Sequence, residues 1–395
     1  MSTQADPGSS IVIIGGGIIG VCTAYFLATH PKYDPSKHTI TILEASSIAS
    51  AASGNAGGLL ALWAYPSCIV PLSFKLHAEL AKELNGAERW GYRSVQCGEI
   101  TAVTSASKIS SKGNGNLGKE HSKTKKGSKA TLPKDLLSWL NPSTITAYDP
   151  MSSPGHTAQV HPRLFTKAIA SEAQRNGVTI TIGRATALNT NSTGAIESIS
   201  YDDAGSSKTL PASTVIVAAG PWSSTLLPAL PSSTVRAHSI IIRTKAPVSA
   251  HALFTSISTS PRSTAATPEI YPRPDGTVYA CGATDSAASL PQLASNVSID
   301  ESQISALHQQ ISSVSPVLAD ADLEAKQACY LPNMEDGGGP VVGRTKTKGV
   351  LVATGHTCWG IQNSCGTGKV VSEMVWEGEA RSADVRELDP GLWGL

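Results

Sequence analysis

A glycine-rich turn that directly follows an apolar run constrains the fold of this chain more than any other feature. The run is Ile11–Ile14, and glycines stand at positions 15, 17 and 20. A short run made only of β-branched residues is typical of a parallel strand that is buried on both faces. We therefore predict a strand over 11–14, a tight turn, and a helix from Ile18 to about His30.

The spacing of these glycines predicts a dinucleotide site. Gly15 permits the tight turn, Gly17 lets the backbone approach a diphosphate, and Gly20 lets the helix pack closely on the strand. The N–H groups of Ile18 and Ile19 stand at the start of the helix, where an anion is favoured.

A second apolar segment, residues 39–43, ends on an acidic residue and completes a strand–helix–strand unit. Glu44 stands where a carboxylate accepts both ribose hydroxyls of a dinucleotide, and Ala45 and Ser46 follow it at the same sheet edge. A carboxylate there would repel a 2′-phosphate, which disfavours NADP. This unit alone leaves NAD and FAD as alternatives.

Charge and cysteine usage argue against several classes of partner. The formal net charge is +1, so we expect neither nucleic acid nor an anionic membrane to bind. The seven cysteines form no C-x-x-C pair, and we expect neither a metal site nor a disulfide framework. The first ten residues carry no secretory signal, and glycines interrupt Ile11–Gly20 too often for a membrane span. We expect a cytoplasmic protein.

Residues 105–134 differ in composition from the rest of the chain. They hold eight lysines, one glutamate and almost no large apolar side chain. Such a segment cannot bury enough apolar surface to offset the entropy lost on ordering, so we predict a flexible basic insertion. A protein partner could bind there, although no motif within the segment indicates one.

Further apolar runs predict the remaining regular structure. A buried strand is expected over 215–219, and an antiparallel pair is expected around Tyr271 and 278–282 with a turn at 274–276. The other predicted elements are helices over 162–176 and 367–376 and strands over 178–182, 240–244 and 350–354.

Several segments together resemble a known family. They are IVIIGGGIIG at 11–20, SGNAGG at 53–58, VIVAAGPW at 215–222, YPRPDGTVYACG at 271–282 and GHTCWGIQNSCGTGK at 355–369. Their order resembles that of the D-amino-acid oxidase superfamily of FAD-dependent oxidoreductases, which includes glycine, sarcosine and fructosyl-amine oxidases. The resemblance favours FAD over NAD and covers most of the chain outside 105–134.

The resemblance implies an α/β fold with two lobes. A Rossmann-like FAD-binding lobe would be built from residues 9–95, 157–235 and 330–385. A second lobe with a mixed antiparallel sheet would hold the substrate and would come from 96–156 and 236–329. The active site would lie between the two lobes.

The resemblance also implies which residues contact FAD. Residues 53–58 would run under the flavin, Ala219 would lie near the adenosine, and Trp222 would pack behind it. His356 and Trp359 are the candidates for contact with the substrate. The full set of implied FAD contacts is Gly15, Gly17, Ile18, Ile19, Gly20, Glu44, Ala45, Ser46, Ser53, Asn55, Ala56, Gly57, Gly58, Ala185, Thr186, Ala219, Gly220, Trp222, Gly355, His356, Trp359, Gly360 and Ile361.

Two features depart from the patterns of the family, and a cysteine near the first of them matches the pattern of one branch. Leu331 stands where glycine oxidase-like members have an arginine for the substrate carboxylate, and Arg344, Arg273 or Arg243 would have to replace it. Cys329 matches the cysteine that carries FAD covalently in sarcosine oxidase-like members, and an ordinary buried cysteine is the alternative.

The second departure lies in the strand Tyr279–Gly282, which lacks the lysine that sarcosine oxidase-like members place above the flavin. A cation beside the reduced flavin assists electron transfer to O2, so this departure weakens the expectation of fast oxidase activity. Lys369 or His356 could serve instead.

The function that the resemblance implies is oxidation of a C–N bond in an amine or an N-substituted amino acid. A hydride would pass to flavin N5, and the resulting imine would hydrolyse. Three alternatives stay open. They are a flavin dehydrogenase that uses an acceptor other than O2, a flavin-bound partner-binding protein with little turnover, for example in endosomal trafficking, and an NAD-dependent dehydrogenase.

Overall fold

A six-stranded sheet forms one half of the computed structural model, which describes residues 8–104, 131–260, 263–335 and 337–395. All of its neighbouring strands run parallel except the outermost pair, β18 and β19. Across the sheet the strands are β18 (Val341–Arg344), β19 (Val350–Thr354), β12 (Thr214–Val217), β1 (Ser10–Ile14), β2 (Thr39–Glu44) and β8 (Thr179–Ile182).

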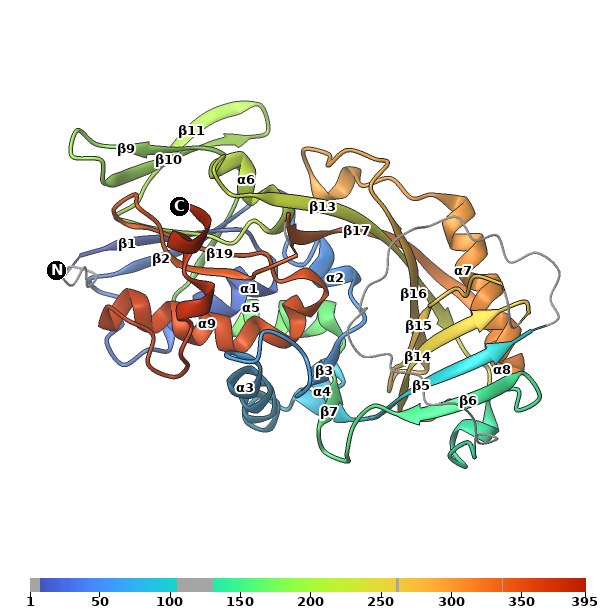
Figure 1. Cartoon of the computed structure of the whole chain (residues 1–395). Helices are drawn as coiled ribbons and strands as arrows, with labels where there is room; N and C mark the ends of the chain where they lie inside the picture. Colours follow the sequence, from blue (N-terminus) through green and yellow to red (C-terminus); the bar gives the residue numbers. More distant parts are fainter. Residues whose placement is uncertain (1–7, 105–130, 261–262, 336) are drawn as a thin grey trace.

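Both faces of this sheet are covered, which explains why its strands are apolar throughout. On one face Ile11 and Ile13 pack against α1 (Ile18–Ala28), α5 (Pro162–Arg175) and α9 (Gly360–Glu377). On the other face Val12 and Ile14 pack toward a three-stranded antiparallel sheet, which lies above the main sheet in Figure 1. That smaller sheet consists of β9 (Arg184–Thr190), β10 (Ile196–Asp203) and β11 (Ser206–Pro211).

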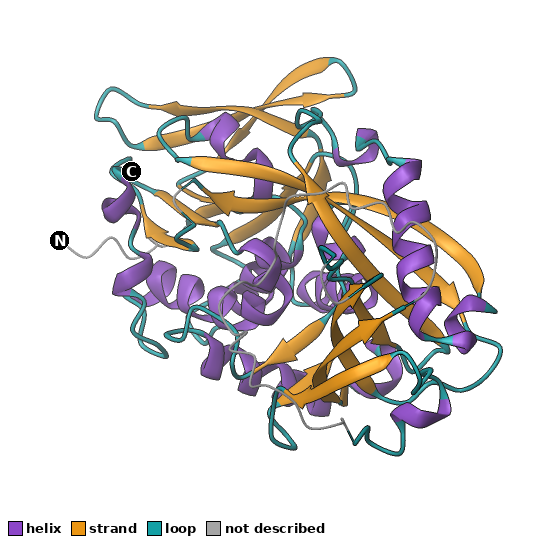
Figure 2. Ribbon diagram, turned by 45° about the vertical axis from the view of Figure 1, so that its right-hand side comes forward, coloured by secondary structure: helices purple, strands orange, loops and turns teal. Residues whose placement is uncertain are grey.

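A second large sheet of seven strands fills the other half of the molecule (Figure 1). Its neighbouring strands are antiparallel except for β5 and β14. In order they are β17 (Asp322–Met334), β13 (Ser232–Arg243), β16 (Thr277–Asp285), β15 (Glu269–Pro272), β14 (His251–Ser258), β5 (Gln96–Val103) and β6 (Ile145–Pro150). Figure 2 shows a helix along its outer side, α7 (Glu301–Val314), whose apolar residues share a core with this sheet.

Shorter elements complete the fold around these sheets. A small sheet combines β3 (Leu59–Ala61), β7 (Thr157–Gln159) and β4 (Arg93–Ser94). The remaining α-helices are α2 (Ala52–Asn55), α3 (Val70–Glu83), α4 (Gly86–Trp90), α6 (Ser223–Leu226) and α8 (Pro316–Ala319). Single 3₁₀ turns span Leu136–Ser138, Gly220–Trp222, Ala294–Asn296, Thr357–Trp359, Arg386–Leu388 and Pro390–Trp393.

The predicted α/β fold is confirmed, with one clear error in a helix boundary. The helix predicted over 367–376 begins earlier, because α9 already starts at Gly360 and includes the glycine-rich stretch before Thr367. Its glycines serve close packing: a Cβ on Gly368 would lie 2.6 Å from the backbone carbon of Cys22 in α1, and one on Gly366 would lie 2.9 Å from Ile69. Glycine here allows helices to approach one another, a tertiary effect that overrides its low helix propensity.

The predictions of a basic insertion and of no membrane span can be compared with the described residues. Most of the basic insertion, residues 105–130, lies outside the described residues, whereas Leu132 near its end is buried in the core of the seven-stranded sheet. In the described part of the chain, no helix combines the length and apolar character that crossing a bilayer requires.

Candidate functional site

A cavity of about 640 Å³ has walls from both large sheets. The six-stranded sheet contributes the carboxyl ends of β1, β2 and β12, the usual ligand edge of a parallel sheet. The seven-stranded sheet contributes residues of β14, β15 and β16 from the opposite side. Its volume lies within the range of sites that enclose small molecules.

At the β1 end of the cavity, the turn and the start of α1 form an anion cradle. Gly15 has a φ of +117°, and a Cβ there would overlap the carbonyl group of Ala218. A Cβ on Gly17 would lie 3.1 Å from the hydroxyl oxygen of Ser53. That hydroxyl accepts a hydrogen bond of 2.9 Å from the N–H of Ile18. Gly17 has no side chain with which to cap α1, and Ser53 takes only the first N–H of the helix, so the positive end of α1 faces the cavity.

Glu44 is held in place at the end of β2 by two backbone N–H groups. One carboxylate oxygen accepts from Gly16 at 2.6 Å and the other from Ser46 at 2.8 Å. The residue is 8% exposed and lines the cavity. Each carboxylate oxygen can accept more than one hydrogen bond, so Glu44 retains acceptor capacity for ligand hydroxyls.

The segment 53–58 forms a tightly packed wall between the two sheets. A Cβ on Gly57 would lie 2.5 Å from a ring carbon of Tyr271, and Gly58 has a φ of +90°. The side chain of Asn55 is fixed from two sides, because its oxygen accepts from Arg163 at 2.8 Å and from Gln327 at 3.0 Å. Glycine at 57 and 58 is therefore required by the packing of this wall.

His356, which follows β19, is the most unusual polar side chain on the cavity wall. It is 2% exposed, and neither ring nitrogen finds a hydrogen-bond partner among the described residues. Burial lowers its pKa from 6.5 to about 3, so the ring is neutral at physiological pH. A buried neutral imidazole offers one donor and one acceptor, and both are available to a ligand.

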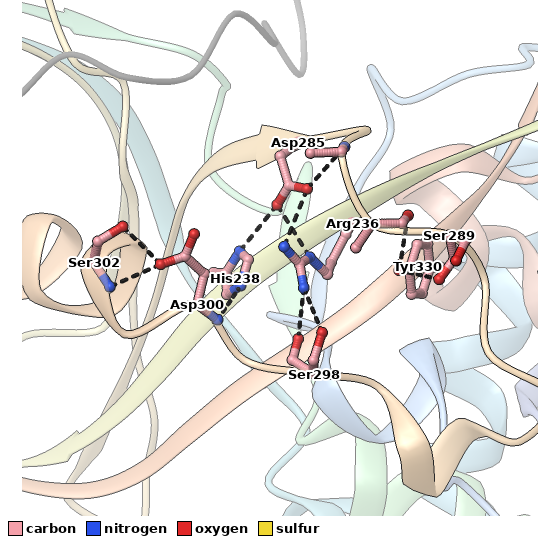
Figure 3. Close-up of polar contacts among 10 residues, drawn as sticks. Arg236, His238, Asp285, Ser289, Ser298, Asp300, Ser302 and Tyr330 are labelled. Atoms are coloured by element: carbon pink, nitrogen blue, oxygen red, sulfur yellow. Dashed lines mark hydrogen bonds and ion pairs between the residues drawn. The ribbon is translucent and has the colours of Figure 1, made fainter.

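A loop between β16 and α7 forms another part of the wall, and a network of side chains anchors it (Figure 3). Arg236 donates to Asp285 at 3.1 and 3.2 Å, and to the carbonyl and hydroxyl oxygens of Ser298 at 3.0 and 2.7 Å. Tyr330 donates to the carbonyl oxygens of Ala288 at 3.0 Å and Ser289 at 2.9 Å. These bonds hold the loop over the cavity.

His238 belongs to the same network. Its Nε2 accepts from the backbone N–H of Asp300 at 3.0 Å, which requires the neutral ring. Burial lowers the pKa of His238, and the positive charge of Arg236 lowers it further.

Aromatic and acidic side chains that the sequence did not single out line the cavity on the side of the seven-stranded sheet. Trp63 meets Phe254 edge to face with ring centres 5.9 Å apart, and meets Trp359 at 5.3 Å. Glu99 and Glu269 stand beside this aromatic group. The only sequence signal would have been a charged residue inside an otherwise apolar strand, which by itself does not indicate a site.

The structure brings most of the expected site residues to this one cavity. Gly20, Thr186 and Gly355 are the exceptions. Gly20 packs against Gly15, Thr186 is an exposed residue of β9 that donates to Ser200, and Gly355 precedes His356 at a φ of +78°. The expected residues that do line the cavity are Gly15, Gly17, Ile18, Ile19, Glu44, Ala45, Ser46, Ser53, Asn55, Ala56, Gly57, Gly58, Ala185, Ala219, Gly220, Trp222, Cys329, His356, Trp359, Gly360 and Ile361.

The sequence profile of the family described as FAD dependent oxidoreductase (DAO) matches residues 10–374. The chain belongs to this family. Two curated relatives match it along nearly their whole length. "Putative oxidoreductase TDA3" of Saccharomyces cerevisiae is 30% identical, covering 99% of this chain and 96% of that protein. "Putative oxidoreductase C1F5.03c" of Schizosaccharomyces pombe is 34% identical, covering 96% of this chain and 97% of that protein.

Solved structures of similar fold include amino-acid-oxidising enzymes. Glycine oxidase from Bacillus cereus aligns with a TM-score of 0.69 at 20% identity, covering 95% of this chain and 96% of that one. L-proline dehydrogenase from P. horikoshii aligns with a TM-score of 0.70 at 14% identity, covering 99% of this chain and 98% of that one. Both likenesses establish the fold, and the chain is an FAD-dependent oxidoreductase by family.

The residues that line the cavity fit the cofactor of this family. A Cβ on Gly15 would overlap the carbonyl group of Ala218 and one on Gly17 would crowd the Ser53 hydroxyl, so glycine keeps the turn tight at the start of α1, where a diphosphate is favoured. Glu44 suits a ribose, and His356 keeps a buried donor and acceptor without protein partners among the described residues. In the same described part of the chain, no group of histidine, cysteine or acidic residues could hold a metal ion.

Of the residues proposed to replace the missing arginine and lysine of the family pattern, only His356 lies on the cavity wall. Arg273, Arg243, Arg344 and Lys369 do not line the cavity, whereas His356 does. Arg273 donates to the carbonyl oxygen of Ala56 at 3.2 Å, and Arg243 pairs with Glu324. Lys369 pairs with Glu373 at 3.3 Å. Leu331, at the place of the family arginine, lines the cavity as an apolar residue.

Cys329 lines the cavity, yet burial raises the pKa of its thiol to about 12. Attack on a flavin requires the thiolate, which this environment disfavours. We therefore expect acid precipitation of the flavin-loaded protein to release all of the yellow colour into the supernatant. Cys329→Ala should retain flavin as the unchanged protein does. Colour that stays with the precipitate, and is lost in Cys329→Ala, would establish the covalent alternative instead.

Proposed function

We propose that the cavity binds FAD and that the protein oxidises a C–N bond of an amine or an N-substituted amino acid. The single observation that carries this proposal is the continuity of the cavity. It joins a dinucleotide cradle at Gly15 and Glu44 to a chamber with aromatic walls, with His356 on the wall of the same cavity. A cofactor bound in the cradle would therefore extend to the place where a small ligand is enclosed.

The roles that we propose for the residues expected to contact FAD combine the geometry of the cavity with the family resemblance. The start of α1 and the backbone at Gly17 would hold the diphosphate. Glu44 would accept hydrogen bonds from the ribose, and Ala185 and Ala219 would lie against the adenosine. Residues 53–58, with Gly360 and Ile361 at the start of α9, would surround the flavin, where the positive end of that helix favours negative charge.

We further propose that residues 9–95, 157–235 and 330–385 form the FAD-binding domain and that 96–156 and 236–329 form the substrate domain. The strands of the six-stranded sheet all fall in the first set. Strands β5, β6, β14, β15 and β16 fall in the second set. The long strands β13 and β17 cross the proposed boundaries and connect the two.

In the proposed reaction FAD takes up the electrons, and the side chains of the protein orient the amine. Bound FAD accepts two electrons, so that an amine loses two electrons and two protons to become an imine, which water hydrolyses to a carbonyl compound and an amine. The aromatic side chains around Trp63 would exclude water from the reacting carbon. His356, neutral by its low pKa, would orient a ligand by hydrogen bonding without holding a proton for transfer.

Anaerobic bleaching of the visible flavin spectrum tests the proposal. We expect at least one amine from a panel of sarcosine, proline, D-amino acids, fructosyl amines and simple alkyl amines to bleach the flavin. Reoxidation by air, compared with reoxidation by a soluble quinone, then distinguishes an oxidase from a dehydrogenase. Purified protein without a flavin spectrum would refute the cofactor. A flavin that no amine bleaches would favour a partner-binding role with little turnover.

A further inference from the structure

A row of side chains across the seven-stranded sheet faces the substrate end of the cavity. Phe254 of β14 is paired with Glu99 of β5 on one side and with Glu269 of β15 on the other. Glu269 is in turn paired with Cys281 of β16. Directly paired residues point to the same face of a sheet, and all four line the cavity. Their chain neighbours Ile100, Leu253 and Ile270 point to the opposite face and pack in the core with α7.

This register places two carboxyl groups on either side of an aromatic ring. Adjacent strands lie about 4.8 Å apart, so the backbones of Glu99 and Glu269 are separated by roughly 10 Å. In the described part of the chain, no lysine, arginine or histidine pairs with either carboxyl. The two groups therefore form an acidic pocket that has no counter-ion among the described residues.

The Glu269 carboxyl is held in position by neighbouring donors. Tyr271 donates a hydrogen bond to it from its hydroxyl, and Cys281 donates from its thiol at 3.6 Å. Burial raises the pKa of Glu269, while these two hydrogen bonds lower it. Burial also raises the pKa of Glu99, and the negative charge of Asp149 adds to that rise. A cation between the two carboxyls would oppose these rises and would itself be stabilised.

The same surroundings disfavour a substrate carboxylate. An amino acid placed here would bring its negative charge toward Glu99 and Glu269, and Leu331 offers it no counter-ion. Arg184 is the one arginine on the described cavity wall, and it stands on β9 next to Ala185, where it pairs with Asp202. By contrast, the aromatic faces of Phe254 and Trp63 favour a cation.

We propose that the substrate is a cationic amine without a carboxylate, with a positively charged group seated beside Phe254 between Glu99 and Glu269. A second nitrogen of the same molecule, neutral when it reacts, is the one oxidised. Diamines and similar polycationic amines are the chemical class that this arrangement fits. The inference rests on the proposed amine oxidation for its place in catalysis, but binding alone can test it.

Three matched probes test the charge preference on the FAD-loaded protein. They are 1,4-diaminobutane, ornithine, which adds a carboxylate to the same skeleton, and butylamine, which lacks the second charge. We expect 1,4-diaminobutane to bind about tenfold or more tightly than either of the others, measured by thermal shift and by perturbation of the flavin spectrum. Ornithine that binds as tightly as 1,4-diaminobutane, or no binding of 1,4-diaminobutane at all, would overturn the inference.

Variants that remove one carboxylate charge test whether Glu99 and Glu269 cause the preference for 1,4-diaminobutane. Glu269→Gln should weaken binding of 1,4-diaminobutane about tenfold and should reduce its advantage over ornithine, because the variant removes both attraction for the cation and repulsion of the carboxylate. Glu99→Gln should act in the same direction, and it serves as the test if Glu269→Gln does not fold. Glu324→Gln is the matched control, because Glu324 belongs to the same sheet but pairs with Arg243 outside the cavity. Unchanged affinity in both cavity variants would refute the assignment.

The failure of this inference can be distinguished from the failure of the proposed oxidation. Binding of 1,4-diaminobutane that depends on Glu269, without bleaching of the flavin by any amine, would retain the charge assignment and refute the oxidation. Bleaching by an amino acid, combined with tighter binding of ornithine, would retain the oxidation and refute the charge assignment.

Discussion

Gly15→Ala is expected to yield protein that contains little or no flavin. The backbone at Gly15 has a φ of +117°, a conformation that costs a residue with a side chain about 1–3 kcal/mol. The added methyl would also lie 2.9 Å from the carbonyl carbon of Ala218 and overlap its oxygen. Relief of this contact requires β1 and β12 to move apart at the edge where the cradle is formed. We therefore expect flavin affinity to fall about tenfold to hundredfold.

The measurement is the ratio of visible flavin absorbance to protein absorbance after gel filtration, with circular dichroism to confirm folding. Gly205→Ala is the matched control. Gly205, which lies between β10 and β11 and does not line the cavity, has a φ of +91°, and no described atom lies within 4 Å of the position of its Cβ. This variant should lose only about 1 kcal/mol of stability, through the strain of an alanine in the left-handed conformation, and should retain flavin. Equal flavin loss in both variants would show that strain alone, and not the cradle at Gly15, is responsible.

The dinucleotide half of the site could be predicted from sequence because local rules determine it. Four β-branched residues, a glycine turn and an acidic residue at the end of the next strand specify a strand, a cradle and a ribose acceptor within 34 residues, from Ile11 to Glu44. The structure places Gly15, Gly17 and Glu44 on one cavity wall. Their assignment to FAD contact is a prediction that the flavin-content measurements test.

The substrate half could not be predicted, because it depends on the pairing of strands that are distant in sequence. Glu99 and Glu269 are brought together by β14, which pairs with β5 on one side and with β15 on the other. Only the register shows that both carboxyls share a face with Phe254. The missed start of α9 has a similar cause, since Gly366 and Gly368 are explained by helices that pack against them and not by their neighbours in sequence.

His356→Phe is expected to have opposite effects on the flavin-free and the flavin-loaded protein. In the flavin-free protein both ring nitrogens are buried without a described partner, so an apolar ring of similar size should increase stability by about 1–3 kcal/mol. If His356 contacts FAD or substrate, as we propose, the same substitution should reduce the stability that flavin adds. The readout is the thermal midpoint of each form, together with the flavin dissociation constant.

The acid dependence of the flavin-free protein gives His356→Phe a second, independent readout. The pKa of His356 is about 3 in the folded state and its ordinary value is 6.5, so the unfolded chain binds the proton first as the pH falls. Its contribution to stability is therefore present above pH 6.5 and is lost as the pH falls toward 3. His356→Phe should reduce this loss.

His77→Phe is the matched control, since His77 is also buried but bonds the carbonyl oxygen of Ile361 at 2.9 Å. That variant should destabilise the flavin-free protein at neutral pH, because it leaves the carbonyl oxygen without this bond. If His356→Phe destabilises the flavin-free protein to the same extent, His356 has a structural role, and its proposed contact with a ligand is refuted.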